Sequence, residues 1–271
     1  MSPLARLRLV LTYLGLGVAA FISVFPFYWM IVGSTNSSAD IIRGRAGFGD
    51  QIAVNVAAFF TQVDAPQVFG NSAILAFFGT TLTLIISSLA GYGFEIFRSR
   101  SRERVFGTLL MMLSIPFAAL MVPLFVMMSS LHLANTYTAI LLPGIASIFI
   151  VFYFRQTTKA FPMELRDAAR IDGLKEWQIF LYIFVPVMRS TYAAATIIVF
   201  MANWNSYLWP LIILQTNDMK TITLVVSSLA SAYTPDYGVV MVGTILATLP
   251  TLAVFFLLQR RFVEGMLGSV K

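Results

Sequence analysis

The segment ELRDAARIDGLKEWQIFLYIFVPV, residues 164–187, interrupts a chain that is otherwise rich in apolar residues. Pro162 suits the first position of a helix, because the N–H that proline lacks would have no partner there. Glu164 and Asp167 lie near the start of this helix, where the helix dipole favours negative charge. Gly173 suits the position just after a helix, where left-handed backbone is needed. These signals predict a short helix that ends at a glycine turn.

We expect this helix over about 163–172, with a length of about 15 Å, and a second helix over about 174–185 that ends at Pro186. Ala168 and Ala169 give the first helix a face without bulk that another surface can approach closely. The second helix carries apolar residues at helical spacing, which suits burial against other helices. These residues are Leu174, Trp177, Phe180, Leu181 and Phe184. The pair is interpreted either as a lever that a partner grips or as an ordinary interfacial loop.

The composition is typical of an integral membrane protein. Of the 271 residues, 58% are hydrophobic and 11% are charged, whereas soluble domains have about 25% charged residues. The chain has no cysteine, which excludes disulfides, thiolate metal sites and a cysteine nucleophile. Its single histidine, His132, is expected to be a loop residue, and no glycine-rich phosphate loop occurs. We therefore expect no cofactor or metal on this chain. If the energy of a nucleotide such as ATP is used, another chain must bind that nucleotide and its Mg²⁺.

Apolar runs predict six transmembrane helices in a single membrane domain, residues 1–271. The fourth run contains Pro143 and Gly144, and the third contains Pro116 and Pro123. Such residues are tolerated where neighbouring helices satisfy the freed backbone groups, so they favour a packed bundle. The first run is interpreted as an uncleaved anchor. The predicted spans are about 10–33, 72–96, 105–130, 138–154, 191–214 and 239–258, with the longest loop at 155–190.

The basic residues indicate the orientation of these spans. Fifteen of the 18 Lys and Arg residues lie in the two termini and in the loops 98–104 and 155–190, all on one side of the six-span arrangement. Positive loops remain in the cytoplasm, so both termini are predicted to be cytoplasmic. The net charge of +6 thus indicates topology, and no nucleic-acid partner is expected. The loop 98–104 either contacts anionic membrane lipid or forms a solvated turn, and Glu95 is expected to pair with nearby arginines. The outer loops 34–71 and 215–238 are expected to fold as caps.

A polar cluster occurs in the fifth predicted span. Polar residues within spans are costly and often functional. The flanking Trp204 and Trp209, together with amide hydrogen bonds, suit a sugar ring, so these residues are a possible substrate path. The alternative is hydrogen bonding between packed helices. The cluster consists of Asn203, Asn205, Ser206 and Tyr207.

The segment Asp167-Ala168-Ala169, with Gly173 and Ile183-Phe184-Val185-Pro186 after it, resembles the EAA loop of bacterial ATP-binding-cassette (ABC) importer permeases, E-A-A-x-x-x-G followed by I-x-L-P. Asp replaces the usual Glu, and Val185 replaces the usual Leu. The stretches NWNSYLWPLIIL, 203–214, and QRRFVEGMLGSVK, 259–271, resemble the maltose-type, MalG-like carbohydrate subfamily. The chain is thus similar to inner-membrane permease subunits of binding-protein-dependent carbohydrate importers.

This resemblance implies an all-α type I ABC importer permease fold with a cytoplasmic coupling helix, in a multi-pass protein of the bacterial inner membrane. It implies a non-catalytic subunit that moves a sugar or oligosaccharide into the cytoplasm. The implied partners are a second, related permease subunit, two ABC ATPase subunits that hydrolyse ATP, and an extracytoplasmic solute-binding protein that the loop 215–238 would probe. The implied ATPase-coupling residues are Glu164, Asp167, Ala168, Ala169, Asp172, Gly173, Pro186, Arg260, Arg261 and Gly265.

Other functions remain open at this point. The same type of importer could carry glycerol phosphate, a polyol or an acidic oligosaccharide. A stand-alone ion-coupled transporter needs carboxylates in mid-span, and none lies there. A membrane enzyme needs a cluster of acids, His or Ser with a base, and only the segment 164–187 gathers charges.

Overall fold

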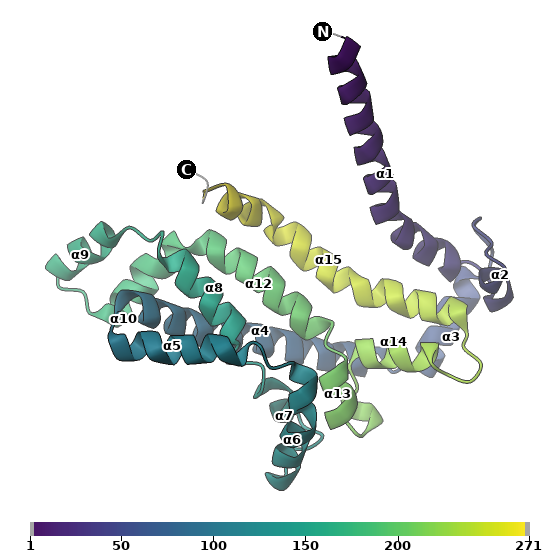
Figure 1. The fold of residues 1–271 in the computed structure, drawn as a ribbon. Coiled ribbons are helices and arrows are strands. Elements are labelled where there is room, and N and C mark those ends of the chain that lie inside the picture. Colours follow the sequence, from purple (N-terminus) through teal and green to yellow (C-terminus); the bar gives the residue numbers. More distant parts are fainter. Residues whose placement is uncertain (1–2, 269–271) are drawn as a thin grey trace. The chain divides into compact units, whose positions relative to one another are not determined.

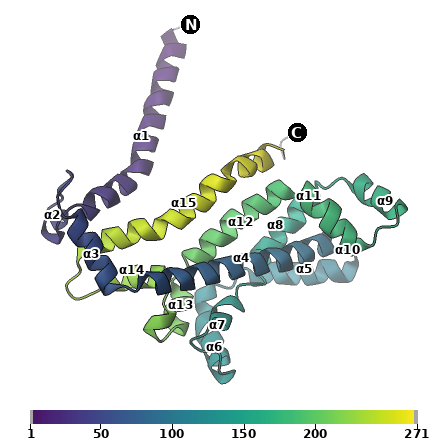
Figure 2. The ribbon, with the colours of Figure 1, turned by 180° about the vertical axis from the view of Figure 1, so that it is seen from behind.

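A computed structural model of the chain describes residues 3–268, and side chains for residues 7–260. Within that part of the chain the regular structure is entirely helical (Figures 1 and 2). The helices are α1 (Pro3–Ser34), α2 (Ser38–Ile42), α3 (Ile52–Gln62), α4 (Ala65–Ile96), α5 (Arg100–Met112), α6 (Phe117–Ser130), α7 (Tyr137–Leu141), α8 (Ile148–Thr158), α9 (Met163–Ile171), α10 (Glu176–Ile179), a π-helix (Phe180–Phe184), α11 (Val185–Val187), α12 (Arg189–Trp204), α13 (Leu208–Ile213), a 3₁₀ turn (Asn217–Met219), α14 (Ile222–Ala230) and α15 (Tyr237–Gly268).

The chain divides into two compact units. Unit 1 comprises residues 1–65 and 225–249, and unit 2 comprises residues 66–224 and 250–271. Three elements therefore have residues in both units: α4, by its first residue alone, α14, and the long α15, which contains Pro250. Unit 2 contains the segment 164–187 and the polar cluster of the fifth predicted span.

Buried amides organise the turn after α1 in unit 1. The Asn55 amide donates hydrogen bonds to the carbonyls of Ser34 and Asn36, and the Asn36 amide donates to those of Val32 and Gly47. Because buried backbone carbonyls need hydrogen-bond donors, two side chains here satisfy four such groups. The segment after α1 is therefore folded over residues 34–55, within the loop predicted over 34–71.

Four helical segments of the described chain are long and apolar enough to cross a membrane: Leu7–Ser34, Ala65–Ile96, Arg189–Ile213 and Tyr237–Arg260. A fifth candidate is the pair α5 and α6, which is bent by 99°. The span predicted over 105–130 is therefore bent within its length. Proline has no N–H to donate into a helix, and α6 begins immediately after Pro116.

The predicted fourth span, 138–154, is not one helix. It consists of the five-residue α7 and the eleven-residue α8, separated by a break that contains Pro143 and Gly144. Hydropathy averages composition over a window and does not detect such a break. The finding supports four or five candidate spans by length and composition, in place of six continuous ones.

The centre of unit 2 is α4, against which α8 and α12 pack (Figures 1 and 2). A Cβ atom at Gly91 would lie 2.6 Å from the Cβ of Phe154 and 2.8 Å from the backbone nitrogen of Arg155. At Gly79 it would lie 2.9 Å from the Asn203 amide carbon. Gly91 thus lets α8 approach α4 more closely than any side chain would allow, whereas Gly79 leaves room for the amide group of the Asn203 side chain.

Candidate functional site

The helix predicted over 163–172 is present as α9, and it protrudes from the end of unit 2 beside α8 and α10 (Figure 1). Pro162 lies one position earlier than predicted, as the extended residue before the first turn. Gly173 has a φ of +83°, and its N–H donates to the carbonyl of Arg170 while the N–H of Leu174 donates to that of Ala169. These bonds form a complete Schellman motif, which sets the turn between α9 and α10.

The two faces of α9 differ. Glu164, Asp167, Ala168 and Ile171 are exposed, and Ile171 is 87% exposed. The opposite face carries Ala169 and Arg166, which are both buried within the chain. The two predicted alanines therefore do not share one displayed surface: Ala168 faces outward, and Ala169 packs inward. Asp172 and Gly173, in the turn, are also exposed.

The chain stays helical through Pro186, contrary to the prediction that this residue ends the second helix. A π-turn precedes it, in which the N–H of Val185 donates to the carbonyl of Phe180, five residues earlier. A proline displaces a helical hydrogen bond, and the wider turn accommodates that loss. The exposed Pro186 is followed by α12 after a short irregularity at Met188.

Burial in the second helix differs in part from the prediction. Phe180 and Phe184 are buried as predicted, and Ile179 joins them. Trp177 is 57% exposed and Leu181 is 49% exposed, so the prediction that they pack against the bundle is wrong. Leu181 lies within the π-turn, which adds a residue to one helical turn, whereas Trp177 lies before it on the exposed side of α10.

An aromatic cluster packs the π-helix that follows α10 against α4. Tyr92 of α4 is buried, and its ring centroid lies 4.8 Å from that of Phe184 and 5.2 Å from that of Phe180. Phe161, just before α9, lies 5.3 Å from Phe184. Such pairs contribute about 0.5–1.5 kcal/mol each beyond the burial of their area. The segment formed by α10 and the π-helix is therefore firmly packed against the C-terminal part of α4.

The sequence did not single out Glu176, the first residue of α10, although it lies at the centre of the charges here. Its carboxylate accepts hydrogen bonds from Arg166 and Arg170 of α9. Burial raises the pKa of Glu176, but the hydrogen bonds and charges of the two arginines outweigh it, so the pKa lies below its ordinary value. The spacing of four between the two arginines, with an acid just past the turn, was the available signal.

A second ionic cluster surrounds Arg155 of α8. Its side chain is 8% exposed and pairs with Glu95 of α4 and Glu103 of α5. The guanidinium carbon also lies 4.0 Å from the centroid of the Phe106 ring. Glu95 pairs with Arg98 as well, so the prediction that Glu95 pairs with nearby arginines is confirmed.

The three predicted coupling residues of the tail lie in α15. Arg260 is exposed. Arg261 and Gly265 lie outside the residues whose side chains the structure describes.

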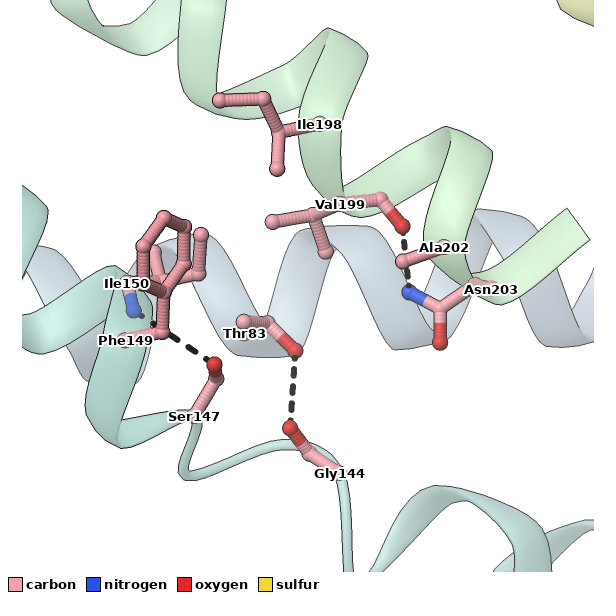
Figure 3. A pocket seen from close by; sticks show the side chains of 9 residues that line it. All are labelled: Thr83, Gly144, Ser147, Phe149, Ile150, Ile198, Val199, Ala202 and Asn203. Carbon is pink, nitrogen blue, oxygen red and sulfur yellow. Dashed lines mark hydrogen bonds between the residues drawn. The ribbon is translucent and has the colours of Figure 1, made fainter. Parts of the chain in front are cut away.

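The four residues of the predicted substrate path do not form one site. Asn203 lines a cavity of about 220 Å³ within unit 2 (Figure 3). Asn205 is exposed, Ser206 is half-buried, and Tyr207 packs against the cluster around Trp209. The nine residues that line the cavity are Thr83, Gly144, Ser147, Phe149, Ile150, Ile198, Val199, Ala202 and Asn203.

The polar groups of this cavity come from three segments. The hydroxyl of Thr83 donates a hydrogen bond to the carbonyl of Gly144 in the break between α7 and α8, at 3.5 Å. The amide nitrogen of Asn203 donates to the carbonyl of Val199, and Ser147 caps the start of α8 (Figure 3). None of the nine lining residues carries a charge. The cavity is therefore suited to a neutral, hydrogen-bonding molecule.

Comparison with known proteins identifies the family. Residues 83–268 match the model of the binding-protein-dependent transport system inner membrane component. The lactose transport system permease protein LacG of Rhizobium radiobacter is 66% identical, over 98% of this chain and 97% of that protein. The arabinooligosaccharides transport system permease protein AraQ of Halalkalibacterium halodurans is 37% identical, over 95% of each. The sn-glycerol-3-phosphate transport system permease protein UgpE of Agrobacterium fabrum is 31% identical, over 99% of this chain and 98% of that protein.

The fold has a counterpart among solved structures. A chain in the crystal structure of a bacterial ABC transporter involved in the import of the acidic polysaccharide alginate has a TM-score of 0.86, with 20% sequence identity, 97% of this chain covered and 99% of that one. The protein is thus a non-enzymatic permease subunit of an ABC importer, with ATPase and solute-binding partners, and it belongs to the family of binding-protein-dependent transport system inner membrane components.

Proposed function

We propose that this chain is one of two related permease subunits of an ABC importer that brings a neutral sugar, of about the size of a disaccharide, from a solute-binding protein into the cytoplasm. The observation that carries this proposal is the two-faced α9. One face, with Asp167 and Ala168, is exposed, while the other face, with Arg166 and Ala169, is buried in the chain. A helix held on one side and open on the other can receive a partner and transmit its motion.

We propose that this open face docks on one of two ATPase subunits. ATP binding would close the ATPase pair and draw the two coupling helices together, and the helical bundle would then open outward. Arg260, Arg261 and Gly265 of the tail would lie against the ATPases as well. Such a device is a two-state element whose equilibrium is biased by ligands at both ends, which is what coupling between distant sites requires.

The proposed topology has six crossings with both termini in the cytoplasm. Four helices and the bent pair α5–α6 supply five crossings by length and composition. The sixth would be the broken α7–α8 segment. Irregular backbone within a membrane is tolerated where protein satisfies it or where it lines a cavity, and the hydrogen bond from Thr83 to Gly144 supports this placement. Fifteen of 18 basic residues then lie on the cytoplasmic side.

The solute is proposed to be neutral. The relative from Rhizobium radiobacter is named for lactose, and the one from Halalkalibacterium halodurans for arabinooligosaccharides. The uncharged cavity beside Asn203 favours a sugar over glycerol phosphate or an acidic oligosaccharide, because a desolvated anion needs cationic partners. We place Asn203 on the solute path, with Asn205, Ser206 and Tyr207 as outer neighbours in the chain.

The solute-binding protein is proposed to contact the loop between α14 and α15. Tyr233 in this loop is fully exposed, at 103%. An isolated aromatic side chain is a common anchor in protein interfaces, which supports a role for Tyr233 in contact with the binding protein.

The docking of α9 can be tested by co-expression of the chain with its second permease subunit and ATPases. Because Ala168 is exposed, Ala168→Glu adds bulk and charge without disturbing a core. We expect this variant to insert normally but to lose co-purification of the ATPase, whereas Ala168→Ser retains it. Normal ATPase binding and transport by Ala168→Glu would overturn the docking proposal.

The solute can be tested with the purified importer in proteoliposomes, supplied with its binding protein. We expect uptake of lactose or a related neutral disaccharide, with weak or no uptake of glycerol 3-phosphate or an acidic oligosaccharide. Preferred uptake of either anion would overturn the neutral-sugar assignment and leave the importer function intact.

A further inference from the structure

A single carboxylate, that of Glu176, contacts three helices. It accepts hydrogen bonds from two arginines of α9: Arg166, at 3.0 Å from Nη2 and 3.4 Å from Nε, and Arg170, at 2.6 Å from Nε. It also accepts a hydrogen bond from the Tyr92 hydroxyl of α4, at 3.3 Å. Because Glu176 itself begins α10, this side chain connects α9, α10 and α4.

The two arginines contribute unequally. The Arg166 side chain is 8% exposed, and its guanidinium carbon lies 5.5 Å from the centroid of the Phe97 ring, near the end of α4. The Arg170 side chain is 49% exposed. Exposed ion pairs contribute little, whereas loss of one partner strands a buried charge. The contact between Arg166 and Glu176 therefore dominates the attachment of α9.

The backbone between α9 and α10 forms a single turn, set by the Schellman motif at Gly173. The connection to α10 consists of the four residues 172–175, and Gly173 adopts a conformation that most residues avoid. On the other side of this turn, α10 and the π-helix are attached to α4 through Tyr92 and the phenylalanine rings. The turn is thus a joint, and the carboxylate of Glu176 bridges it.

We infer that Glu176 is a positioning residue that locks the joint between α9 and α10, so that a displacement of α9 reaches the C-terminal end of α4 undiminished. This inference rests on the proposed coupling role of α9. Without this contact, α9 would move with the ATPase but the displacement of α4 would be smaller, so less sugar would be transported for each ATP hydrolysed.

The test uses the complete importer in proteoliposomes, with sugar uptake and ATP hydrolysis measured on the same sample. Glu176→Gln retains the shape of the side chain and removes its charge. We expect the complex to assemble and the ratio of sugar transported to ATP hydrolysed to fall at least about fivefold, the lower range of coupling between sites. Arg166→Gln should resemble it, Arg170→Gln should have a smaller effect, and Lys175→Gln, an exposed neighbour, should have none.

A covalent bridge separates the lock from a merely structural role. The chain has no native cysteine, so Arg166→Cys with Glu176→Cys introduces a unique pair, in a complex whose other subunits lack reactive cysteines. We expect the double-cysteine variant to transport little sugar per ATP hydrolysed while the two thiols are unconnected. A short bifunctional thiol reagent that bridges them should restore the wild-type ratio of sugar transported to ATP hydrolysed. The inference would be overturned if Glu176→Gln, or the double-cysteine variant without the reagent, had the wild-type ratio. It would also be overturned if the double-cysteine variant stayed uncoupled after the reagent had bridged it.

A separate measurement distinguishes this failure from failure of the proposed function. Cross-linking from the side chain of an Ala168→Cys variant to the ATPase, with Glu176 unchanged, tests whether α9 docks at all. If cross-linking is efficient and Glu176→Gln leaves the ratio of sugar transported to ATP hydrolysed unchanged, only the positioning role of Glu176 is overturned. If no cross-link forms, the coupling role of α9, on which that inference rests, is overturned.

Discussion

The two ends of α4 are attached to the rest of unit 2 by different chemistry. At its C-terminal end, Glu95 pairs with Arg155, and Tyr92 meets Glu176 with its two arginines; we term this the arginine end. At its N-terminal end, the buried Asn71 donates to the carbonyls of Asp218 and Lys220, at 2.7 and 2.9 Å, and accepts from the Tyr137 hydroxyl at 2.7 Å; we term this the amide end. The arginine end is the one that carries α9.

The difference concerns how each end responds to the loss of one group. A neutral hydrogen bond contributes about 0.5–1.5 kcal/mol net, so the amide end divides its stability among small contributions. A buried charge whose partner is removed costs several kcal/mol. The arginine end is therefore rigid while its ions are paired and fragile when one is lost. This combination suits a region that must transmit force as one body.

The largest effect is expected for Arg155→Met at the arginine end. This change leaves the mostly buried Glu95 without its buried partner and removes the contact with the Phe106 ring. We expect the free energy of unfolding to fall by about 3–5 kcal/mol, measured by SDS titration of the purified chain in mixed micelles.

Two further variants make this prediction specific. Arg98 is 55% exposed, so Arg98→Gln should cost less than about 1 kcal/mol. Arg155→Met combined with Glu95→Gln should recover part of the loss, because no buried charge then remains unpaired. An Arg155→Met chain as stable as the wild type would contradict the idea that the paired ions hold this end.

A smaller loss is expected for Gly91→Ala, on α4 near the same end. The new methyl group would lie 2.6 Å from the Cβ of Phe154 and 2.8 Å from the backbone of Arg155, so α4 and α8 must separate. Overpacking of this kind costs about 1–3 kcal/mol. Gly93 provides the matched control, since a Cβ there meets nothing within 4 Å. Gly93→Ala should be neutral or stabilising, and equal effects of the two alanines in the same unfolding assay would show that close approach is not the cause.

At the amide end, Asn71→Leu removes hydrogen bonds without removing a charge. We expect it to lower the free energy of unfolding by about 1–2 kcal/mol, given the small net value of each neutral bond. The loss should be the same at low and at high salt, since no ion is involved. By contrast, the small effect of Arg170→Gln should vanish at high salt, because exposed charges are screened. A salt-dependent loss for Asn71→Leu would blur the distinction between the two ends.

The sequence predicted the parts of this arrangement that depend on local rules. The helix α9, the turn at Gly173 and the pairing of Glu95 follow from capping, backbone conformation and the cost of an unpaired acid near the membrane. The motif of residues 167–186, together with the stretches 203–214 and 259–271, indicated the family. These features need no knowledge of distant residues.

The failures involve geometry that local rules do not contain. Trp177 and Leu181 were placed on the buried side because they are apolar at helical spacing, and the packing of α10 and the π-helix against α4 leaves both exposed. The partners of Glu176 and Arg155 come from other helices: Arg155 and Glu95 are 60 residues apart. Small size alone does not tell whether an alanine packs inward or receives a partner, so Ala168 and Ala169 were not distinguished. The choice between inward and outward faces is made by tertiary packing.

The smallest effect is expected from acid, and it too separates the two ends. The pKa of Glu176 lies below its ordinary value of 4.5 because Arg166 and Arg170 outweigh the effect of burial. A lowered pKa means that the lock contributes its full stability above that ordinary value and loses it as the pH falls through the lower one. The groups that face Glu176 are Arg166, Arg170 and the Tyr92 hydroxyl. The joint between α9 and α10 should therefore remain closed from pH 8 to about pH 5 and loosen only below 4.5. Spin labels on cysteines introduced at the exposed positions 165 and 182 would report this loosening as a broadened distance distribution.

Two controls accompany this measurement. The distance distribution of Glu176→Gln should be broad at every pH, and labels across the amide end should not respond to acid. Broadening of the wild-type distance distribution between pH 5 and 7 would mean that a titrating group other than Glu176 controls the joint. Glu176 would then not be the residue that distinguishes the arginine end from the amide end.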